Sequence, residues 1–133
     1  MIWNQSIECM DREQLREIQS QRLVKMAHYV YYNTPFYRAK FQEMGLEPGD
    51  IKSIDDIVKL PFTNKLDLRD NYPFGLAAVP MSQIVRIHAS SGTTGKPVVV
   101  LYTRKDLAMW SEAISRAFTA YGDTKEDIFQ VAY

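Results

Sequence analysis

The chain has 133 residues, and its 16 basic and 16 acidic side chains give a formal net charge of zero. Without a basic surplus, the sequence indicates neither a nucleic-acid partner nor binding to a membrane surface. No apolar run is long enough to cross a bilayer, and Glu8, Asp11 and Glu13 are unlike the start of a signal peptide. Cys9 is the single cysteine, which excludes an intrachain disulfide and favours a reduced, cytoplasmic setting.

Residues 1–80 predict several helices separated by turns, with no strand pattern. The apolar side chains of the short lead, Trp3 among them, are expected to dock on the body of the protein. Asp11 is expected to cap a long helix that ends near Asn33. The apolar stripe of this helix consists of Leu15, Ile18, Leu23, Met26, Ala27 and Val30. Thr34 is the predicted cap of a second helix.

Aromatic side chains are frequent in these two helices, at positions 29, 31, 32, 36, 37 and 41. They allow either a ring-binding surface or a packed core, and their helical spacing favours the core. Gly45 is expected to end the second helix. Two short helices come next, one with a capping box of Ser53 and Asp56 and one capped by Thr63.

A polar, glycine-containing loop at 90–97 separates two predicted strands at 84–89 and 98–102. The loop is longer than a reversal needs, and surplus polar loop is where binding sites commonly lie. Gly92 and Gly95 can adopt positive φ, which lets consecutive backbone N–H groups face one anion. The side chains that add hydroxyl donors or positive charge are Ser90, Ser91, Thr93, Thr94 and Lys96. The sequence therefore predicts a site for a polyphosphate.

This loop differs from a Walker A site in its spacing and in the element expected after it. A Walker A loop places four residues between its glycines, and a helix begins directly after it. Here Gly95 comes three positions after Gly92, and Lys96 is followed by Pro97 and a valine run. No helix N-terminus is expected at the anion, so loop amides and hydroxyls must bind it alone. A flexible surface loop without a ligand is the alternative interpretation.

The last part of the chain predicts a helix and then a strand. Thr103 and Asp106 form a capping pair, and Gly122 lies where a C-cap glycine belongs. The side chains expected to face a sheet are Trp110, Ile114 and Phe118. A strand at 128–133 would complete a βαβ unit with at least two parallel strands. Because chains rarely stop on an apolar strand, a longer protein is expected.

The string Ser-Ser-Gly-Thr-Thr-Gly-Lys-Pro at 90–97 resembles the phosphate-binding loop of the AMP-forming adenylating enzymes, the acyl-CoA synthetase and luciferase superfamily. Further stretches are similar to the phenylacetate–CoA ligase branch, at 31–37, 61–76, 86–89 and 97–100. Val98 departs from the wider superfamily, in which many members carry a lysine there. That branch commonly lacks the lysine too, so the departure supports the narrower resemblance.

The resemblance implies an α/β fold in two parts. Residues 1–80 would form a helical N-terminal region, and residues 81–133 the beginning of an α/β ATP-binding domain with the order strand, phosphate loop, strand, helix, strand. Family members are about three times as long, so this chain would be an N-terminal fragment that is inactive alone. The full enzyme would be a cytoplasmic ligase that joins phenylacetate to CoA. It would use ATP with Mg2+, form an acyl-adenylate, and release AMP and pyrophosphate.

The resemblance also implies roles for particular residues. Those expected at the ATP phosphates are Ser90, Ser91, Gly92, Thr93, Thr94, Gly95 and Lys96. Tyr133 begins a segment that lines the acid pocket in relatives, and a structural core tyrosine is the alternative for it. His88 is assigned an orienting or packing role, because the reacting carboxylate needs no base. The family's catalytic lysine and metal contacts lie beyond Tyr133, so none is expected here.

Two other functions stay open on the sequence alone. One is a phosphate- or nucleotide-binding module without chemistry, and the other is a helical interaction domain formed by residues 11–72. For the ligase, the implied partners are a small aryl acid, ATP and CoA, without nucleic acid or membrane. A homodimer is a further expectation, because the family is often dimeric. The aryl acid itself stays open among phenylacetate and its hydroxylated or indolyl analogues.

Overall fold

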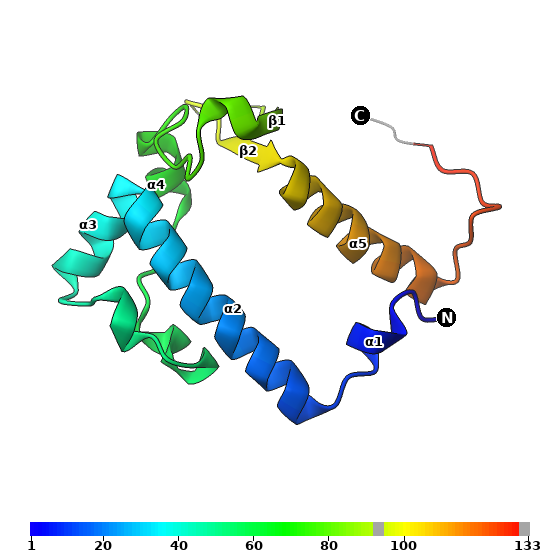
Figure 1. Cartoon of the computed structure of the whole chain (residues 1–133). Coiled ribbons are helices and arrows are strands. Elements are labelled where there is room, and N and C mark those ends of the chain that lie inside the picture. Colours follow the sequence, from blue (N-terminus) through cyan, green and yellow to red (C-terminus); the bar gives the residue numbers. More distant parts are fainter. Residues whose placement is uncertain (92–94, 131–133) are drawn as a thin grey trace.

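The computed structural model describes residues 1–91 and 95–130, which form a set of helices and a two-stranded sheet (Figure 1). In chain order the elements are α1 (Gln5–Glu8), α2 (Arg12–Asn33), α3 (Pro35–Glu43), η1 (Pro48–Asp50), η2 (Ile54–Lys59), α4 (Lys65–Asp70), η3 (Met81–Gln83), β1 (Ile84–Ala89), β2 (Val99–Thr103) and α5 (Arg104–Tyr121). The ribbon traces an open ring, with α2 and α5 as two sides (Figure 1). The predicted mixed α/β class is confirmed, since helices precede the strands and another helix comes after them.

Local capping fixes the ends of α2 where the sequence predicts them. The Asp11 Oδ1 atom accepts the backbone N–H groups of Glu13 and Gln14, at 2.9 and 3.0 Å. This side chain satisfies two of the donors that a helix start leaves unpaired. The helix ends at Asn33, because Pro35 begins α3 and disfavours helical geometry in the residue before it.

The short helix α3 also begins and ends near the predicted positions. Thr34 is its N-cap residue, with an extended backbone, but the side chain makes no capping hydrogen bond. Thr34 is instead 1% exposed and packs in the interior. Gly45 comes after the C-cap residue Met44 with φ of +66°, the left-handed conformation that glycine adopts most easily after a helix.

The cap of α4 lies one residue later than predicted, at Asn64 and not at Thr63. The Asn64 Oδ1 atom accepts the Asp67 N–H at 3.1 Å, and Asp67 Oδ2 accepts the Asn64 N–H at 2.8 Å. Asparagine caps a helix better than threonine does, and the Thr63 hydroxyl lies 3.0 Å from a tyrosine hydroxyl of α3. The capping box predicted for Ser53 and Asp56 is confirmed at η2.

The core of the helical region lies where α2 meets α3, η1 and the residues after them. Ala27, Tyr31, Phe41 and Ile51 are buried there, and the Tyr31 and Phe41 rings meet edge to face at 5.6 Å. Edge-to-face contact is a favoured arrangement of aromatic rings, so the predicted aromatic core is confirmed at these two positions. Met26 is 55% exposed, contrary to its predicted place in the apolar stripe. It directly precedes the buried Ala27, and consecutive side chains of a helix point in different directions.

Lys40 of α3 ties the core to α4. Its Nζ atom lies 2.8 Å from Asp67 Oδ2 and also donates to the Phe62 carbonyl oxygen at 2.8 Å. The Lys40 hydrogen bond and the backbone N–H of Asn64 lower the pKa of the Asp67 carboxyl. One carboxylate therefore caps α4 and anchors it to α3.

β1 and β2 form an antiparallel hairpin in which Ile87 pairs with Leu101 and His88 with Val100. The predicted third strand is wrong for 128–130, which carry no strand, and residues 131–133 lie outside the described part. A strand forms only beside a partner that shares its backbone hydrogen bonds. The 18-residue helix α5 leads away from the hairpin, and residues 122–130 after it form no ladder with β1 or β2 (Figure 1). No parallel pair exists among the described residues.

Both ends of α5 match the sequence, but its predicted buried face does not. Thr103 and Asp106 form the capping box, and Gly122 has φ of +102° at the C-cap. The side chains predicted to face a sheet are 40–42% exposed, namely Trp110, Ile114 and Phe118. A two-stranded hairpin is too small to cover a helix of this length, so only its first turns pack on β2.

The N-terminal lead docks on α5 through polar atoms. The Trp3 Nε1–H donates to Glu112 Oε2 at 2.8 Å, and Asn4 Nδ2 donates to Glu112 Oε1 at 2.7 Å. Arg116, one turn along α5, lies 2.8 Å from the same carboxylate. The lead therefore contacts the body of the protein, but the expected docking of its apolar side chains is wrong for Ile2 and Trp3, which stay 54% and 56% exposed.

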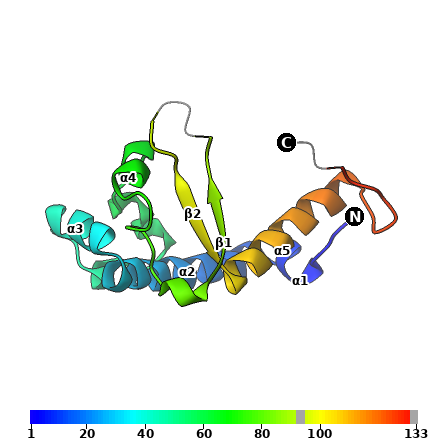
Figure 2. The same ribbon diagram turned by 90° about the horizontal axis from the view of Figure 1, so that it is seen from above.

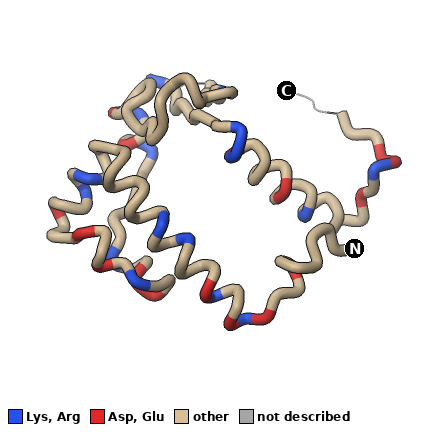
Figure 3. The backbone as a smooth tube through the Cα atoms, viewed as in Figure 1, with Lys and Arg blue, Asp and Glu red and all other residues tan. Residues whose placement is uncertain are grey.

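Charged residues of both signs are interspersed along the described chain (Figure 3). Among the residues that the structure describes, no helix combines the length and apolar character that a membrane-spanning helix requires.

Replacing Phe41, which is 2% exposed, with alanine should destabilise the helical region. We expect Phe41→Ala to lower the free energy of unfolding by about 3–5 kcal/mol, because it leaves a cavity in the core. The matched control is Phe62→Ala at a side chain that is 94% exposed, where a change within about 0.5 kcal/mol is expected. Urea unfolding followed by circular dichroism measures both, and equal losses would contradict this description of the core.

Acidification should weaken the docking of the lead on α5. The hydrogen bonds from Arg116, Asn4 and Trp3, in that order, lower the pKa of Glu112 from 4.5 to about 2. A depressed carboxyl pKa stabilises the folded state above the unfolded value, and this contribution is lost as the pH falls from 4.5 toward 2. We expect Glu112→Gln to flatten the pH dependence of Tm in that interval. Glu126→Gln is the control at a side chain 82% exposed, and identical profiles for Glu112→Gln and wild type would refute the expectation.

Candidate functional site

The loop singled out by the sequence lies at the free end of the β1–β2 hairpin (Figure 2). β1 leads into it and β2 leads out of it toward α5. Gly92, Thr93 and Thr94 lie outside the described residues, as does Tyr133, so their assigned roles stay predictions. Of the candidate residues, the structure brings Ser90, Ser91, Gly95 and Lys96 to this one end of the hairpin.

Ser90 and Val98 close the neck of the loop by two reciprocal hydrogen bonds. The Ser90 N–H donates to the Val98 carbonyl at 2.9 Å, and the Val98 N–H donates to Ser90 Oγ at 2.9 Å. The Ser90 hydroxyl thus acts as an acceptor toward the neck, while its own hydrogen can still donate to a ligand. The neck fixes where the loop residues leave the sheet.

Gly95 and Lys96, at the end of the loop that leads into β2, supply a positive φ and a positive charge, both of which favour anion binding. Gly95 has φ of +126°, which confirms the positive φ predicted for it. Apart from its chain neighbours, no atom of the described residues lies within 4 Å of the position that a Cβ would occupy, so the requirement for glycine comes from the backbone conformation. Lys96 is exposed and carries a positive charge on a flexible stem.

Three aromatic rings, one from each strand of the hairpin and one from α5, pack together beside the hairpin. The His88 ring meets Tyr102 at 5.0 Å and Trp110 at 5.5 Å, both edge to face, and Tyr102 stacks on Trp110 at 5.4 Å. The contact of Tyr102 and Trp110 with His88 was missed by the sequence reasoning. The pairing of the two predicted strands could have indicated part of it, because diagonal neighbours across an antiparallel pair, such as His88 and Tyr102, share a face of the sheet.

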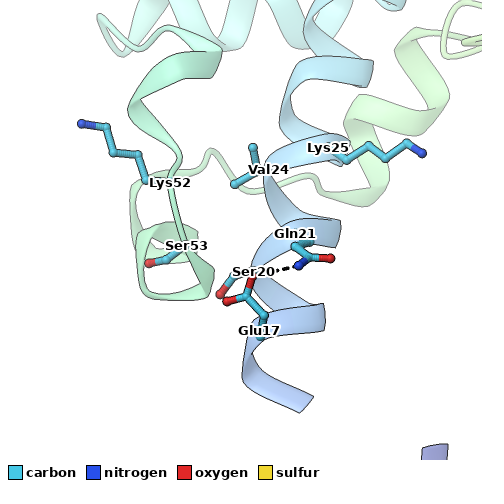
Figure 4. A pocket seen from close by; sticks show the side chains of 7 residues that line it. All are labelled: Glu17, Ser20, Gln21, Val24, Lys25, Lys52 and Ser53. Carbon is cyan, nitrogen blue, oxygen red and sulfur yellow. Dashed lines mark hydrogen bonds between the residues drawn. The ribbon is translucent and has the colours of Figure 1, made fainter. Parts of the chain in front are cut away.

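Two hollows lie elsewhere in the molecule, and neither includes a loop residue. Figure 4 shows the first, of about 420 Å3, between α2 and η2. Ser20 Oγ accepts the Ile54 N–H at 3.1 Å, and Gln21 donates to Glu17 at 2.8 Å. The side chains of Lys25 and Lys52, which also line it, point away from the hollow (Figure 4). The second, of about 300 Å3, has a mainly apolar lining that includes Phe74 and Leu101. The loop is therefore the candidate in which hydroxyls, backbone amides and a lysine lie together on one short segment.

Metal ligands are not gathered in the part of the chain that the structure describes. Within residues 1–91 and 95–130, no group of three or more His, Cys, Asp or Glu side chains lies where it could hold a metal ion. The donors of the loop are hydroxyls, amides and an ammonium group, which suit an anion and not a cation.

Comparison with solved structures defines the class of protein. No protein-family model matches the chain. An open form of 2-hydroxyisobutyryl-CoA ligase, in complex with 2-HIB-AMP and CoA, superposes with a TM-score of 0.81 and 30% identity, over 92% of this chain and 29% of that one. A second structure of that ligase, in its thioester-forming state, superposes with a TM-score of 0.73 and 33% identity, over 80% of this chain and 24% of that one. The chain therefore has the fold of a segment of the adenylating acyl-CoA ligases.

Curated relatives narrow this class to one branch. Phenylacetate–coenzyme A ligase of Thermus thermophilus is 47% identical over 122 residues, which are 92% of this chain and 27% of that protein. The Escherichia coli K12 and Pseudomonas putida ligases of the same name are 48% and 46% identical over 127 residues, 96% of this chain and 29% of theirs. The chain belongs to the phenylacetate–CoA ligase family of the AMP-forming adenylating enzymes. It spans less than a third of the length of these relatives.

Removing the Ser90 hydroxyl should open the neck of the loop. Ser90→Ala deletes the acceptor of the Val98 N–H, and a neutral hydrogen bond contributes about 0.5–1.5 kcal/mol, so the Val98 amide should exchange up to about tenfold faster. Hydrogen exchange measured by NMR tests this. Ser91→Ala, at the exposed neighbour, is the matched control, and unchanged Val98 exchange in Ser90→Ala would show that the neck does not depend on this bond.

Proposed function

We propose that this chain carries the ATP-phosphate loop of an aryl acid–CoA ligase. The full-length protein would convert phenylacetate, ATP and CoA to phenylacetyl-CoA, AMP and pyrophosphate through an acyl-adenylate. The observation that carries the proposal is the Ser/Thr/Gly/Lys loop at the end of an antiparallel hairpin, in a chain 46–48% identical to phenylacetate–CoA ligases. The 133 residues alone would be inactive, because they match less than a third of such an enzyme.

The chemistry assigned to the loop is the control of charge on a polyphosphate. When the carboxylate of the acid attacks the α-phosphorus, negative charge moves onto the departing pyrophosphate. The hydroxyls of Ser90 and Ser91, the ammonium of Lys96 and the amides next to Gly95 would donate to the β- and γ-phosphates. Hydrogen bonds to a charged group contribute about 1.5–3 kcal/mol each, so several of them would hold the nucleotide.

Thr93 and Thr94 would add two hydroxyls to this set, and Gly92 a second flexible position. Tyr133 is proposed at the edge of the acid pocket. Mg2+ would arrive as the counter-ion of ATP, since the loop residues are donors that suit phosphate oxygens. The ion would neutralise phosphate charge, and the loop would orient the phosphates so that pyrophosphate can leave.

The two-part organisation is proposed along with the function. Residues 1–80 would form a helical N-terminal region, and residues 81–133 would begin the ATP-binding domain. A homodimer, a cytoplasmic location and the absence of nucleic-acid or membrane partners complete the proposal. They are supported by the balanced charge and by the family to which the chain belongs.

Straining the loop should stop the use of ATP by the full-length natural chain. Gly95→Val forces a β-branched residue to a φ of +126°, a strain of about 1–3 kcal/mol that should lower phenylacetate-dependent ATP–pyrophosphate exchange by about ten- to a hundredfold. The matched control is Gly49→Ala, where the glycine does not have a positive φ and a Cβ meets no neighbour within 4 Å. Isotope exchange from labelled pyrophosphate into ATP measures both.

Two results would decide against the proposal. Exchange that survives Gly95→Val unchanged would remove the loop from the ATP site. The absence of exchange with phenylacetate and with every other aryl acid would favour a binding module without chemistry, which tight ATP binding by the 133-residue chain would then confirm.

A further inference from the structure

Three rings from three different elements meet just below the phosphate loop. His88 lies on β1, two residues before the neck residue Ser90, while Tyr102 lies on β2 and Trp110 on α5. The three centroid distances are 5.0, 5.5 and 5.4 Å, so each ring contacts both of the others. The cluster is thus a closed triangle, which resists rotation of any one ring.

The contact between His88 and Trp110 joins elements that are remote along the chain. β2 runs directly into α5, so a contact between those two is a consequence of their connection. β1 has no such direct connection to α5, and the His88 ring, which stands edge-on to Trp110 at 73°, makes a contact between them. Edge-to-face pairs of rings stabilise a contact beyond the area they bury, which favours one angle of the exposed hairpin to α5.

This angle reaches the loop through a short rigid path. Ser90 follows directly after β1, two residues beyond His88. Ser90 in turn closes the neck with Val98. A change in the orientation of His88 therefore moves the residue from which the loop departs.

We propose that His88 is a positioning residue of the phosphate loop, which acts by packing its ring against Tyr102 and Trp110. The inference rests on the proposed function, since it assigns the cluster to the same ATP site. His88 holds the β1 end of the loop at a fixed angle to α5, so that the loop donors converge on the phosphates without rearrangement. The ring shape of the side chain matters in this role, and its basicity does not.

The kinetic test compares variants with and without a ring, in the full-length natural chain. His88→Val keeps a good strand former but removes the ring, and it should raise KM for ATP about three- to tenfold with kcat changed by less than about twofold. His88→Phe keeps a ring and should restore KM to within about twofold of wild type. Ile87→Val, at the neighbouring position on the other face of β1, is the matched control and should leave both constants unchanged.

A second pair of variants tests the same contact from α5. Trp110→Leu removes the opposite ring and should raise KM for ATP as His88→Val does. The double variant should cost no more than either single change, because both delete one shared interaction. If His88→Val does not fold, Trp110→Leu with Trp110→Phe as its ring-keeping control carries the comparison. Fluorotryptophan NMR adds a readout without turnover: the Trp110 resonance should shift in His88→Val and return toward wild type in His88→Phe.

Each outcome either supports or overturns the inference. An unchanged KM for ATP in His88→Val and Trp110→Leu overturns it, and so does equal impairment in His88→Val and His88→Phe, which would assign the effect to the imidazole itself. The Gly95→Val variant separates this failure from that of the proposed function. If Gly95→Val lowers ATP–pyrophosphate exchange as expected while the ring variants behave as wild type, the assignment of the loop to ATP is kept and only the role of His88 is refuted.

Discussion

The antiparallel pairing of β1 with β2 is the contact on which the arrangement of this chain depends. It joins the helical region, packed around Phe41, to α5. Further along, α5 contacts the lead through Glu112 and the segment after it through Phe118. Each strand has only the other as its partner among the described residues, so the register rests on a single ladder and on the side chains that cross it. The reciprocal bonds of Ser90 with Val98 extend that ladder to the neck of the loop.

Carboxylates in this chain are used mainly for local structure. Asp11, Asn64 with Asp67, and Thr103 with Asp106 cap helices, and Asp127 closes the turn at Thr124, where backbone and hydroxyl donors lower its pKa. These acidic groups therefore neutralise helix starts and turns, and they do not surround the loop. The zero net charge of the whole chain thus coexists with a loop whose described ionisable residue is a lysine.

Elements whose ends are set by residues nearby in the chain were predictable from the sequence. Elements that need a partner remote along the chain were not. The limits of α2 and α5 are set by Asp11, Pro35 and Gly122, each of which acts within one turn of the chain. The error at Thr63 is of one residue, since two adjacent capping side chains compete and sequence alone does not rank their geometry. The inward face of α5 and the strand at 128–130 required a larger sheet, and such a partner cannot be inferred from periodicity. At the site, Gly95 was foreseen from composition, whereas the meeting of Trp110 with His88 depends on the angle between a helix and a hairpin.

The position of α5 explains why the loop carries so many donors of its own. In many phosphate sites the amides and the dipole of a helix N-terminus face the anion. Here the N-terminus of α5 begins after the five residues of β2, roughly 17 Å along a strand from the loop, and its own amides are capped by Thr103 and Asp106. That helix start cannot serve a phosphate at the far end of the hairpin. A loop between two strands must therefore supply hydroxyls, a lysine and glycine-dependent amides itself, which accounts for its composition without a helix behind it.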